Sequence, residues 1–354
     1  MTELFPASVV GSMPRPPEVR AMVNRGETDS PAMDEAIRKV VALQEAAGLD
    51  VVTDGEWRRL SYIGVIAELA HGFEVGTNPA DGRPWTIVKD RLELKPGGFI
   101  AREARFLRQV TGRRIKVTLP APALLGERLW SAEHSTAAYP DRRDFIRACL
   151  PPLRREIELL ADAGVDIVQI DDPHLCLFVD PEIRETYADP DEAADFSVAM
   201  VNELVEGITG PTIALHLCRR AGARARGEKD HKGGYAAILP QINRLAVNHL
   251  TIEFSTPGSG DMSVLADFRP DLEIGLGCVG VTPGAIDPVR TVVDRVEQAL
   301  RFVAPERVTL NPDCGFAPGS AAEVDLDEVA AKLRIEVAAA YLLRRAHGGA
   351  AGPA

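Results

Sequence analysis

Eight short runs of apolar, mostly β-branched residues recur along the chain, and most are separated by longer stretches with helical periodicity. Within each run the apolar residues are nearly continuous, which is typical of parallel strands buried on both faces. This alternation constrains the fold more than any other feature, because parallel neighbours need crossover connections. The runs lie at residues 7–12, 49–56, 114–120, 166–173, 211–218, 249–254, 272–279 and 307–315.

Helical patterns fall between these runs, at residues 33–47, 141–163, 190–206, 235–246, 287–304 and 325–345. Gly48, Gly164 and Gly207 stand where a glycine usually ends a helix, and Asp325 with Glu328 resembles an N-terminal capping box. Strands that alternate with helices predict an α/β protein with a parallel sheet, and eight strands predict a (β/α)8 TIM barrel. An open doubly wound sheet is the alternative, but no G-x-G-x-x-G turn follows the first run.

The domain organisation follows from length and from one long interval. A chain of 354 residues is long enough for two domains of about 150 residues, but an α/β barrel often exceeds 250 residues as one unit. We expect one barrel domain over residues 1–346 and a disordered tail at 347–354. The interval 57–113 is too long for one crossover. It predicts an elaborated segment after strand 2, with a helix near 61–70, a hairpin near 85–95 and a helix near 99–110.

Charge and cysteine use exclude several classes of function. A net charge of −12 disfavours nucleic acid as a partner, because no overall positive field attracts phosphates. The five cysteines are widely spaced and odd in number, which favours a reducing compartment over a disulfide framework. The N-terminus shows no signal-peptide pattern, and no apolar run is long enough to span a bilayer. We therefore expect a cytoplasmic enzyme with no membrane partner.

Chemically capable side chains gather at the carboxyl ends of the predicted strands. In a barrel these ends share one face, and active sites are built on that face. Residues that are distant in sequence would therefore meet in space. They are Ser12, Asp54, Glu56, Asp171, Asp172, His216, Cys218, Glu253, Cys278, Asp313 and Cys314.

His216 and Cys218 form the first candidate metal site. They are two residues apart at the end of a predicted strand, so both side chains project from the same face. Zn²⁺ favours imidazole and thiolate ligands in a tetrahedral arrangement. Glu253 and Cys314, at the ends of later strands, are candidates for the third and fourth ligands, and Cys278 is a rival. The alternative is that the cysteines are small buried hydrophobes and the histidine a hydrogen-bonded core residue.

Such a site favours activation of a thiol substrate. A free thiol titrates near ~8.5, and coordination to zinc makes it a nucleophilic thiolate at neutral pH. Hydrolysis by zinc-bound hydroxide is the alternative, but two thiolate ligands donate charge and make the metal a weaker Lewis acid.

Seven motifs, in order along the chain, resemble the catalytic barrel of the cobalamin-independent methionine synthases. The resemblance is to the short, single-barrel relatives, a group that also includes the epoxyalkane:coenzyme M transferases. The ordered H-x-C, Glu and Cys set and the last motif are the most specific. The motifs are "VGSMPRPPEVR" (10–20), "DGEWRR" (54–59), "QIDDP" (169–173), "LHLC" (215–218), "IEFS" (252–255), "GLG" (275–277) and "NPDCGF" (311–316).

The resemblance implies roles for seven residues. It implies zinc bound by a histidine, two cysteines and a glutamate: His216, Cys218, Glu253 and Cys314. By the same match, Ser12, Glu56 and Asp171 would hold the amino-acid part of homocysteine. Carboxylates suit an α-ammonium group, and a serine hydroxyl suits an α-carboxylate. The alternative for the two acids is helix capping or an ion pair with Arg15, Arg58 or Arg59.

Two departures from the family pattern leave the methyl donor open. The loop 277–288 lacks the histidine expected to protonate a folate leaving group, and residues 117–126 lack the tryptophan expected to stack on folate. His174, directly after "QIDDP", is our candidate replacement acid, with a structural role as the alternative. The basic segment 219–234 is either a lid for an anionic substrate group or a solvated loop.

The chain is therefore predicted to be a zinc-dependent thiol alkyltransferase that transfers a methyl group to homocysteine to form methionine. One alternative is alkylation of another thiol, such as coenzyme M, by an epoxide. A second is a barrel that binds a small molecule or a corrinoid protein without turnover. A decarboxylase of the uroporphyrinogen type is a further alternative, but it would not need the Cys/His set. The sequence specifies neither the donor nor the oligomeric state.

Overall fold

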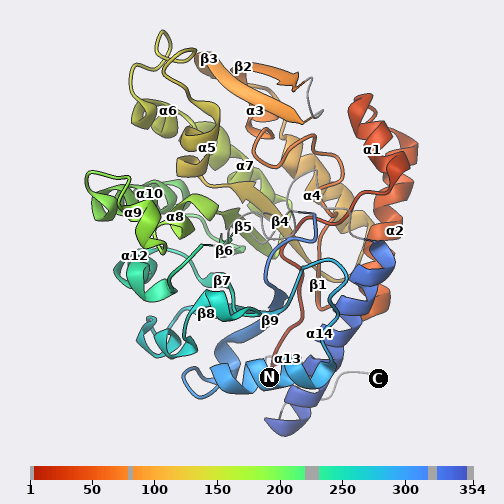
Figure 1. The fold of residues 1–354 in the computed structure, drawn as a ribbon. Helices are drawn as coiled ribbons and strands as arrows, with labels where there is room; N and C mark the ends of the chain where they lie inside the picture. Colours follow the sequence, from red (N-terminus) through yellow and green to blue (C-terminus); the bar gives the residue numbers. More distant parts are fainter. Residues whose placement is uncertain (1–3, 79–82, 220–230, 318–324, 349–354) are drawn as a thin grey trace.

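The computed structural model describes residues 4–78, 83–219, 231–317 and 325–348 (Figure 1). Residues 220–230 of the predicted lid and 349–354 of the predicted tail lie outside the described residues. Within them, seven strands form one parallel sheet in the order β1-β4-β5-β6-β7-β8-β9. These are β1 (Val51–Val52), β4 (Arg114–Pro120), β5 (Ile167–Asp171), β6 (Thr212–Leu217), β7 (His249–Glu253), β8 (Glu273–Val279) and β9 (Val308–Pro312).

The segment predicted as the first strand closes this sheet into a barrel. Ala7 pairs in parallel with Leu310 of β9, and Ser8 pairs in parallel with Val51 of β1. The α/β barrel prediction is therefore confirmed, with the N-terminal segment in the eighth strand position.

The first strand is much shorter than the predicted run 7–12 because side chains take its carbonyl groups. The Lys116 ammonium donates to Val9 O at 2.7 Å, and the Gln169 amide donates to Val10 O at 3.0 Å. The Thr53 hydroxyl donates to Gly11 O at 2.7 Å. A strand ladder would need these acceptors for backbone N–H groups, so pairing stops after two residues.

All six predicted helical regions contain helix, although two of them are divided. The region 141–163 breaks at Cys149, because the prolines that follow start a new helix and cannot continue the old one. The region 235–246 begins as a 3-10 turn. The elements are α2 (Pro31–Ala47), α6 (Arg142–Ala148), α7 (Leu150–Asp162), α10 (Pro190–Val205), η1 (Tyr235–Ile238), α12 (Leu239–Arg244), α13 (Val289–Ala299) and α14 (Leu326–Ala346).

Four of the described helices were not predicted, and each of them begins at a proline. They are α1 (Pro17–Asn24), α5 (Pro122–Leu129), α8 (Pro173–Leu177) and α9 (Pro181–Arg184). Proline suits the first helical position, where its missing N–H has no intrahelical partner to lose. Three short 3-10 turns complete the described elements: η2 (Pro257–Ser259), η3 (Met262–Asp267) and η4 (Pro305–Arg307).

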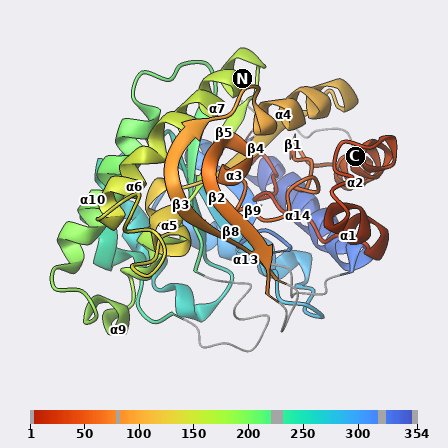
Figure 2. The same ribbon diagram turned by 90° about the horizontal axis from the view of Figure 1, so that it is seen from above.

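The elaborated segment after β1 contains a two-stranded antiparallel hairpin, β2 (Ala70–Thr77) with β3 (Pro84–Leu94). It lies at the top of the molecule in Figure 1 and in front of the sheet in the view from above (Figure 2). The helix predicted at 61–70 is only α3 (Ile66–Leu69), because the hairpin begins at the next residue. The helix predicted at 99–110 is α4 (Phe99–Val110). It returns the chain to the barrel and packs on α7, where Glu156 accepts the Ala101 N–H at 3.0 Å.

Helix ends follow the predicted signals with one correction. Gly48, which ends α2, is left-handed with φ of 91°, and Gly164 and Gly207 also have positive φ. Asp325 caps α14 by accepting from Asp327 N, but the capping box is wrong in its second member. The Glu328 carboxylate instead accepts the Gly284 N–H and pairs with Lys332. No helix among the described residues has the length and apolar character needed to cross a membrane.

Candidate metal and substrate site

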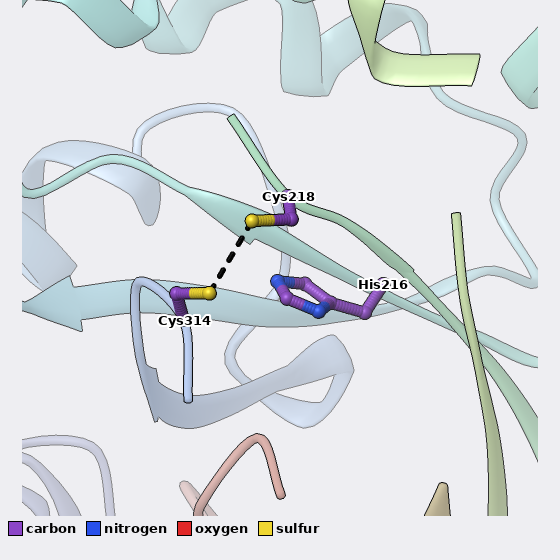
Figure 3. A group of neighbouring side chains, drawn as sticks. All are labelled: His216, Cys218 and Cys314. Carbon is purple, nitrogen blue, oxygen red and sulfur yellow. Dashed lines mark hydrogen bonds between the residues drawn. The ribbon is translucent and has the colours of Figure 1, made fainter. Parts of the chain in front are cut away.

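Strand ends on opposite parts of the sheet bring two thiols and an imidazole together. His216 lies on β6, Cys218 follows it, and Cys314 follows β9 (Figure 3). The two sulfur atoms are 3.3 Å apart although the residues are 96 positions apart. The ligand atoms of all three residues lie within 4.8 Å of one another. Two strands separate β6 from β9 in the sheet order, so closure of the barrel creates this group.

The His216 ring is oriented by Asp171, at the end of the neighbouring strand β5. Asp171 Oδ1 lies 3.2 Å from His216 Nδ1. The other ring nitrogen, Nε2, is buried and has no hydrogen-bond partner among the described residues. A carboxylate on one nitrogen and an open second nitrogen is the arrangement in which proteins present histidine to a metal. A buried nitrogen without a partner is costly, so a bound cation would suit it.

The two cysteines also fit a cation. Their mutual hydrogen bond and burial raise the pKa of Cys314 well above its ordinary value, and the charges of Glu253 and Asp171 act in the same direction. Two adjacent thiols beside two carboxylates would resist ionisation without a positive charge. A divalent cation would remove that resistance, and the soft sulfur donors favour zinc over magnesium or calcium.

Glu253, the predicted fourth ligand, adjoins this group but is not part of it. Its side chain is fully buried at the end of β7, and its Oε1 accepts the Arg219 N–H at 2.6 Å. Its own N–H donates to the Tyr235 hydroxyl at 2.9 Å. Cys278, the predicted rival, lies elsewhere, with its sulfur 3.6 Å from the Asn311 carbonyl oxygen. The group among the described residues therefore consists of His216, Cys218 and Cys314.

Ser12 lies beside the loop that carries Cys314. Its carbonyl accepts the Phe316 N–H at 2.9 Å. A Cβ atom on Gly315 would lie only 2.2 Å from the Ser12 hydroxyl oxygen, so this position requires glycine. The N-terminal segment and the last strand loop thus place the predicted serine next to a predicted metal ligand.

Glu56 is buried in a tight turn after β1. Its φ is +61°, an uncommon value for a residue with a side chain, and Asp54 Oδ1 accepts its N–H at 2.9 Å. Its carboxylate accepts the Thr118 hydroxyl at 2.7 Å. Burial raises the pKa of Glu56 against the charge of Arg59, and Asp171 raises it further. Two predicted substrate carboxylates therefore influence one another.

Glu56 and Asp171 neither cap a helix nor form an ion pair with one of the nearby arginines among the described residues. Arg58 pairs with Asp34, and Arg59 pairs with Glu103. Arg15 donates to the backbone carbonyl of Glu56 at 2.6 Å. The acid that caps α8 is Asp172, whose Oδ1 accepts the Leu175 N–H at 2.9 Å.

His174 lies in α8, outside the three-residue group. Its ring packs edge-on against Phe178 with the ring centres 5.4 Å apart, and burial lowers its pKa. Its role as an acid stays a prediction.

The structure adds Tyr62, which sequence reasoning missed. Burial raises the pKa of Tyr62, and the charges of Cys218 and Asp171 add to the effect. Tyr62 lies in an irregular segment, and no sequence pattern indicates that it comes near Cys218 and Asp171.

A (β/α)8 barrel that gathers thiols, an imidazole and carboxylates at the carboxyl ends of its strands defines a barrel enzyme. The chain belongs to the family described as "Cobalamin-independent synthase, Catalytic domain", whose sequence model matches residues 5–341. It is therefore a methyltransferase of the methionine synthase type.

Similar proteins agree with this assignment. The methionine synthase of Saccharolobus islandicus is 28% identical over 327 residues, which cover 88% of each chain. That of Sulfolobus acidocaldarius is 26% identical over 331 residues, covering 88% of this chain and 86% of the other. The fold resembles a B12-independent methionine synthase from Shewanella sp. W3-18-1, solved in complex with selenomethionine. The TM-score is 0.77 and the identity 22%, over 97% of this chain and 98% of the other.

Proposed function

We propose that this protein transfers a methyl group to the thiol of homocysteine, forming methionine, with a zinc ion bound by His216, Cys218, Glu253 and Cys314. The gathering of His216, Cys218 and Cys314 at the barrel mouth carries this proposal, because their ligand atoms lie within 4.8 Å of one another. Zinc bound there would lower the pKa of a coordinated substrate thiol and keep it a nucleophilic thiolate at neutral pH.

The surrounding residues prepare the ligands. Asp171 would accept a hydrogen bond from a protonated His216 Nδ1, which leaves the Nε2 lone pair available for the metal. The Arg219 N–H holds the Glu253 carboxylate in place from one side. A carboxylate is more easily displaced from zinc than a thiolate, so Glu253 is the ligand that an incoming thiol would replace.

The two carboxylates near the metal group support homocysteine as the thiol. Glu56 and Asp171 are close enough for the charge of Asp171 to raise the pKa of Glu56. Together they would bind an α-ammonium group, and Ser12 would hydrogen-bond the α-carboxylate. Coenzyme M carries a sulfonate and no ammonium group, so two carboxylates would repel it.

Methyl transfer forms the new sulfur–carbon bond as the donor's bond to methyl breaks. The leaving group takes that electron pair and then needs a proton. We propose His174 as the source of this proton, because it lies in the first turn of α8, directly after the end of β5 that carries Asp171.

Metal analysis of cysteine variants tests the metal assignment. Cys218→Ser and Cys314→Ser should each lose bound zinc and reduce homocysteine methylation by about 100-fold or more, since each removes one ligand. Cys278→Ser is the matched control, because that buried cysteine bonds Asn311 instead, and it should keep both zinc and activity. Full activity in metal-free wild-type protein would overturn the proposal.

A further inference from the structure

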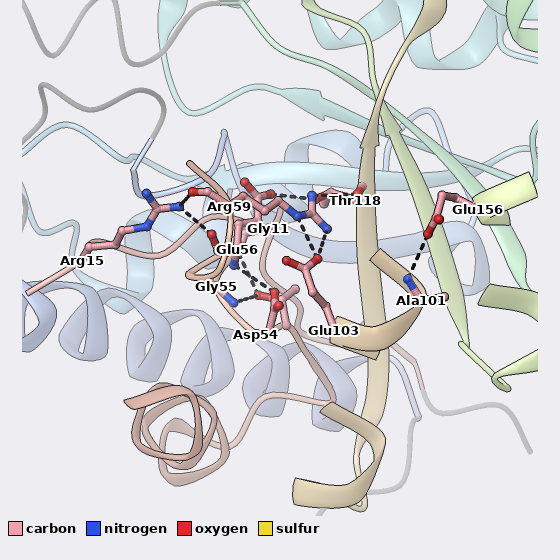
Figure 4. Close-up of polar contacts among 11 residues, drawn as sticks. Gly11, Arg15, Asp54, Gly55, Glu56, Arg59, Ala101, Glu103, Thr118 and Glu156 are labelled. Carbon is pink, nitrogen blue, oxygen red and sulfur yellow. Dashed lines mark hydrogen bonds and ion pairs between the residues drawn. The ribbon is translucent and has the colours of Figure 1, made fainter. Parts of the chain in front are cut away.

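The carboxylate of Glu56 is linked through two side chains to a second buried acid, Glu103 on α4 (Figure 4). Thr118, on β4, donates its hydroxyl proton to Glu56 Oε1 at 2.7 Å. The same hydroxyl oxygen accepts a hydrogen bond from Arg59 Nη1 at 3.0 Å. Arg59 then pairs with Glu103. We call these four side chains the Arg59 relay: Glu103, Arg59, Thr118 and Glu56.

The guanidinium of Arg59 pairs with Glu103 and is linked to Glu56 by hydrogen bonds through Thr118. Its Nε and Nη2 both donate to Glu103 Oε2, at 2.9 and 2.8 Å. Its Nη1 donates to the carbonyl and hydroxyl oxygens of Thr118. A hydroxyl has one proton and a guanidinium cannot accept it, so Thr118 accepts from Arg59 and donates its proton to Glu56. Each hydrogen bond of the relay therefore has a defined donor and acceptor.

The positive charge of Arg59 is buried together with the other side chains of the relay. Glu103, Arg59 and Thr118 are each 3% exposed, and Glu56 is 7% exposed. A buried cation without a counter-ion is strongly unfavourable, so Arg59 needs an adjacent carboxylate. Glu103 provides one. The hydrogen bonds of Arg59 also link it, through Thr118, to the carboxylate of Glu56.

We propose that Glu103 is a positioning residue that holds Arg59 against Thr118 and keeps its charge from pairing directly with Glu56. The Glu56 carboxylate then remains available for the α-ammonium group of the substrate. This inference rests on the proposed function, because it takes Glu56 as the ammonium-binding residue. The ammonium selectivity of the site would thus depend on a helix residue that does not contact substrate.

Kinetics with two thiol substrates distinguish this positioning role of Glu103 from a general contribution to the stability of the fold. Homocysteine carries the α-ammonium group, and 4-mercaptobutyrate is the same acid without it. In the full-length zinc-loaded protein, Glu103→Gln should raise KM for homocysteine about tenfold, the worth of one charge-assisted contact. It should leave kcat, and the kinetics with 4-mercaptobutyrate, within about twofold of wild type.

A second substitution tests the direction of the effect. In the double variant Arg59→Gln with Glu103→Gln, the Arg59 charge is gone and cannot pair with Glu56, so the preference for homocysteine should return to within about threefold of wild type. Thr118→Val removes the bridging hydroxyl but leaves the Arg59–Glu103 ion pair in place, so it should change the preference for homocysteine less than Glu103→Gln does. Glu336→Gln, a buried acid on α14 that is outside the relay, is the control and should leave the preference unchanged.

Each outcome decides the inference. An equal loss with both thiols, or a double variant that does worse than Glu103→Gln, would show an ordinary structural ion pair and overturn it. A wild-type enzyme that does not prefer homocysteine over 4-mercaptobutyrate would instead overturn the proposed role of Glu56. Selective loss in Glu103→Gln with recovery in the double variant supports both.

Discussion

At the scale of single residues, Asp171 connects the metal group to the substrate site. Its Oδ1 accepts from Gln169 Nε2 at 2.8 Å and lies 3.2 Å from His216 Nδ1. Its charge also reaches Glu56, whose pKa it raises. One carboxylate therefore orients a metal ligand and shapes the pocket proposed for the ammonium group.

This double role predicts a double defect in Asp171→Asn. The amide keeps the size of the side chain but removes the charge, so zinc affinity should fall about 10- to 100-fold. KM for homocysteine should rise in the zinc-saturated enzyme as well. Competition with a chelator measures the first effect, and steady-state kinetics the second. Asp172→Asn is the neighbouring control, since Asp172 caps α8, and unchanged zinc affinity in Asp171→Asn would refute the orienting role.

Sequence reasoning at this scale identifies side chains by their chemistry and misses those that act through others. His216, Cys218 and Cys314 belong to motifs, and their chemistry alone suggests a metal. Arg59 and Glu103 are ordinary charged residues in the sequence, and 44 positions separate them. Only the packing of α4 against the loop after β1 reveals that they meet.

At the scale of secondary structure elements, the last helix secures the first strand position. Glu336 on α14 accepts the Ser8 N–H at 3.0 Å. Arg344, on the same helix, donates to the carbonyls of Leu4 and Phe5 and pairs with Asp50. The described part of the N-terminal segment, from residue 4 on, has two β-bridges to its neighbours, and these contacts from α14 help to hold it in the barrel.

The burial of Glu336 predicts a pH-dependent stability. Burial raises its pKa to about 8, although the Ser8 hydrogen bond and Lys116 oppose the shift. The folded protein therefore binds a proton there that the unfolded chain releases at lower pH. This contribution to stability is complete below the unfolded pKa and is lost as pH rises through about 8.

Glu336→Gln should flatten that dependence. Between pH 5 and pH 9 the unfolding free energy of wild type should fall, relative to the variant, by on the order of a few kcal/mol. Lys116, whose pKa burial lowers to about 7, is present in both proteins. Urea unfolding at several pH values measures the difference, and parallel curves for the two proteins would contradict the assignment.

The elements were predictable where a pattern is long. The buried parallel strands and the long helices α2, α10 and α14 follow from periodicity. Short helices lack a full period, and α1, α5, α8 and α9 could have been found only from their initial prolines. The prediction made the first strand too long. Its apolar residues do not reveal that the side chains of Lys116, Gln169 and Thr53 donate hydrogen bonds to its carbonyl groups.

At the scale of the whole molecule, the order of the strands determines the site. The metal group needs β6 and β9, which two strands separate and which face one another because the sheet curves into a barrel that Ala7 and Ser8 close. We propose that residues 1–346 form one folding unit, because α14 and the N-terminal segment close it together. The urea curves described above should then show one transition, and two separated transitions would contradict this proposal.

The barrel could be predicted from the sequence because eight strands with helical connections leave few topologies. The position of Glu253 could not, because its distance from the other ligands depends on the contacts of Arg219 and Tyr235. The hairpin was predicted near 85–95, but only its second strand, β3, lies there, because it pairs with β2 before it and not with a strand inside that range.

The most direct test of the central claim is a zinc K-edge absorption spectrum of the purified protein, with and without homocysteine. We expect a zinc coordinated by sulfur, nitrogen and oxygen, and replacement of the oxygen ligand by a third sulfur when homocysteine binds. Protein without zinc, or a zinc whose coordination is unchanged by saturating homocysteine, would contradict it.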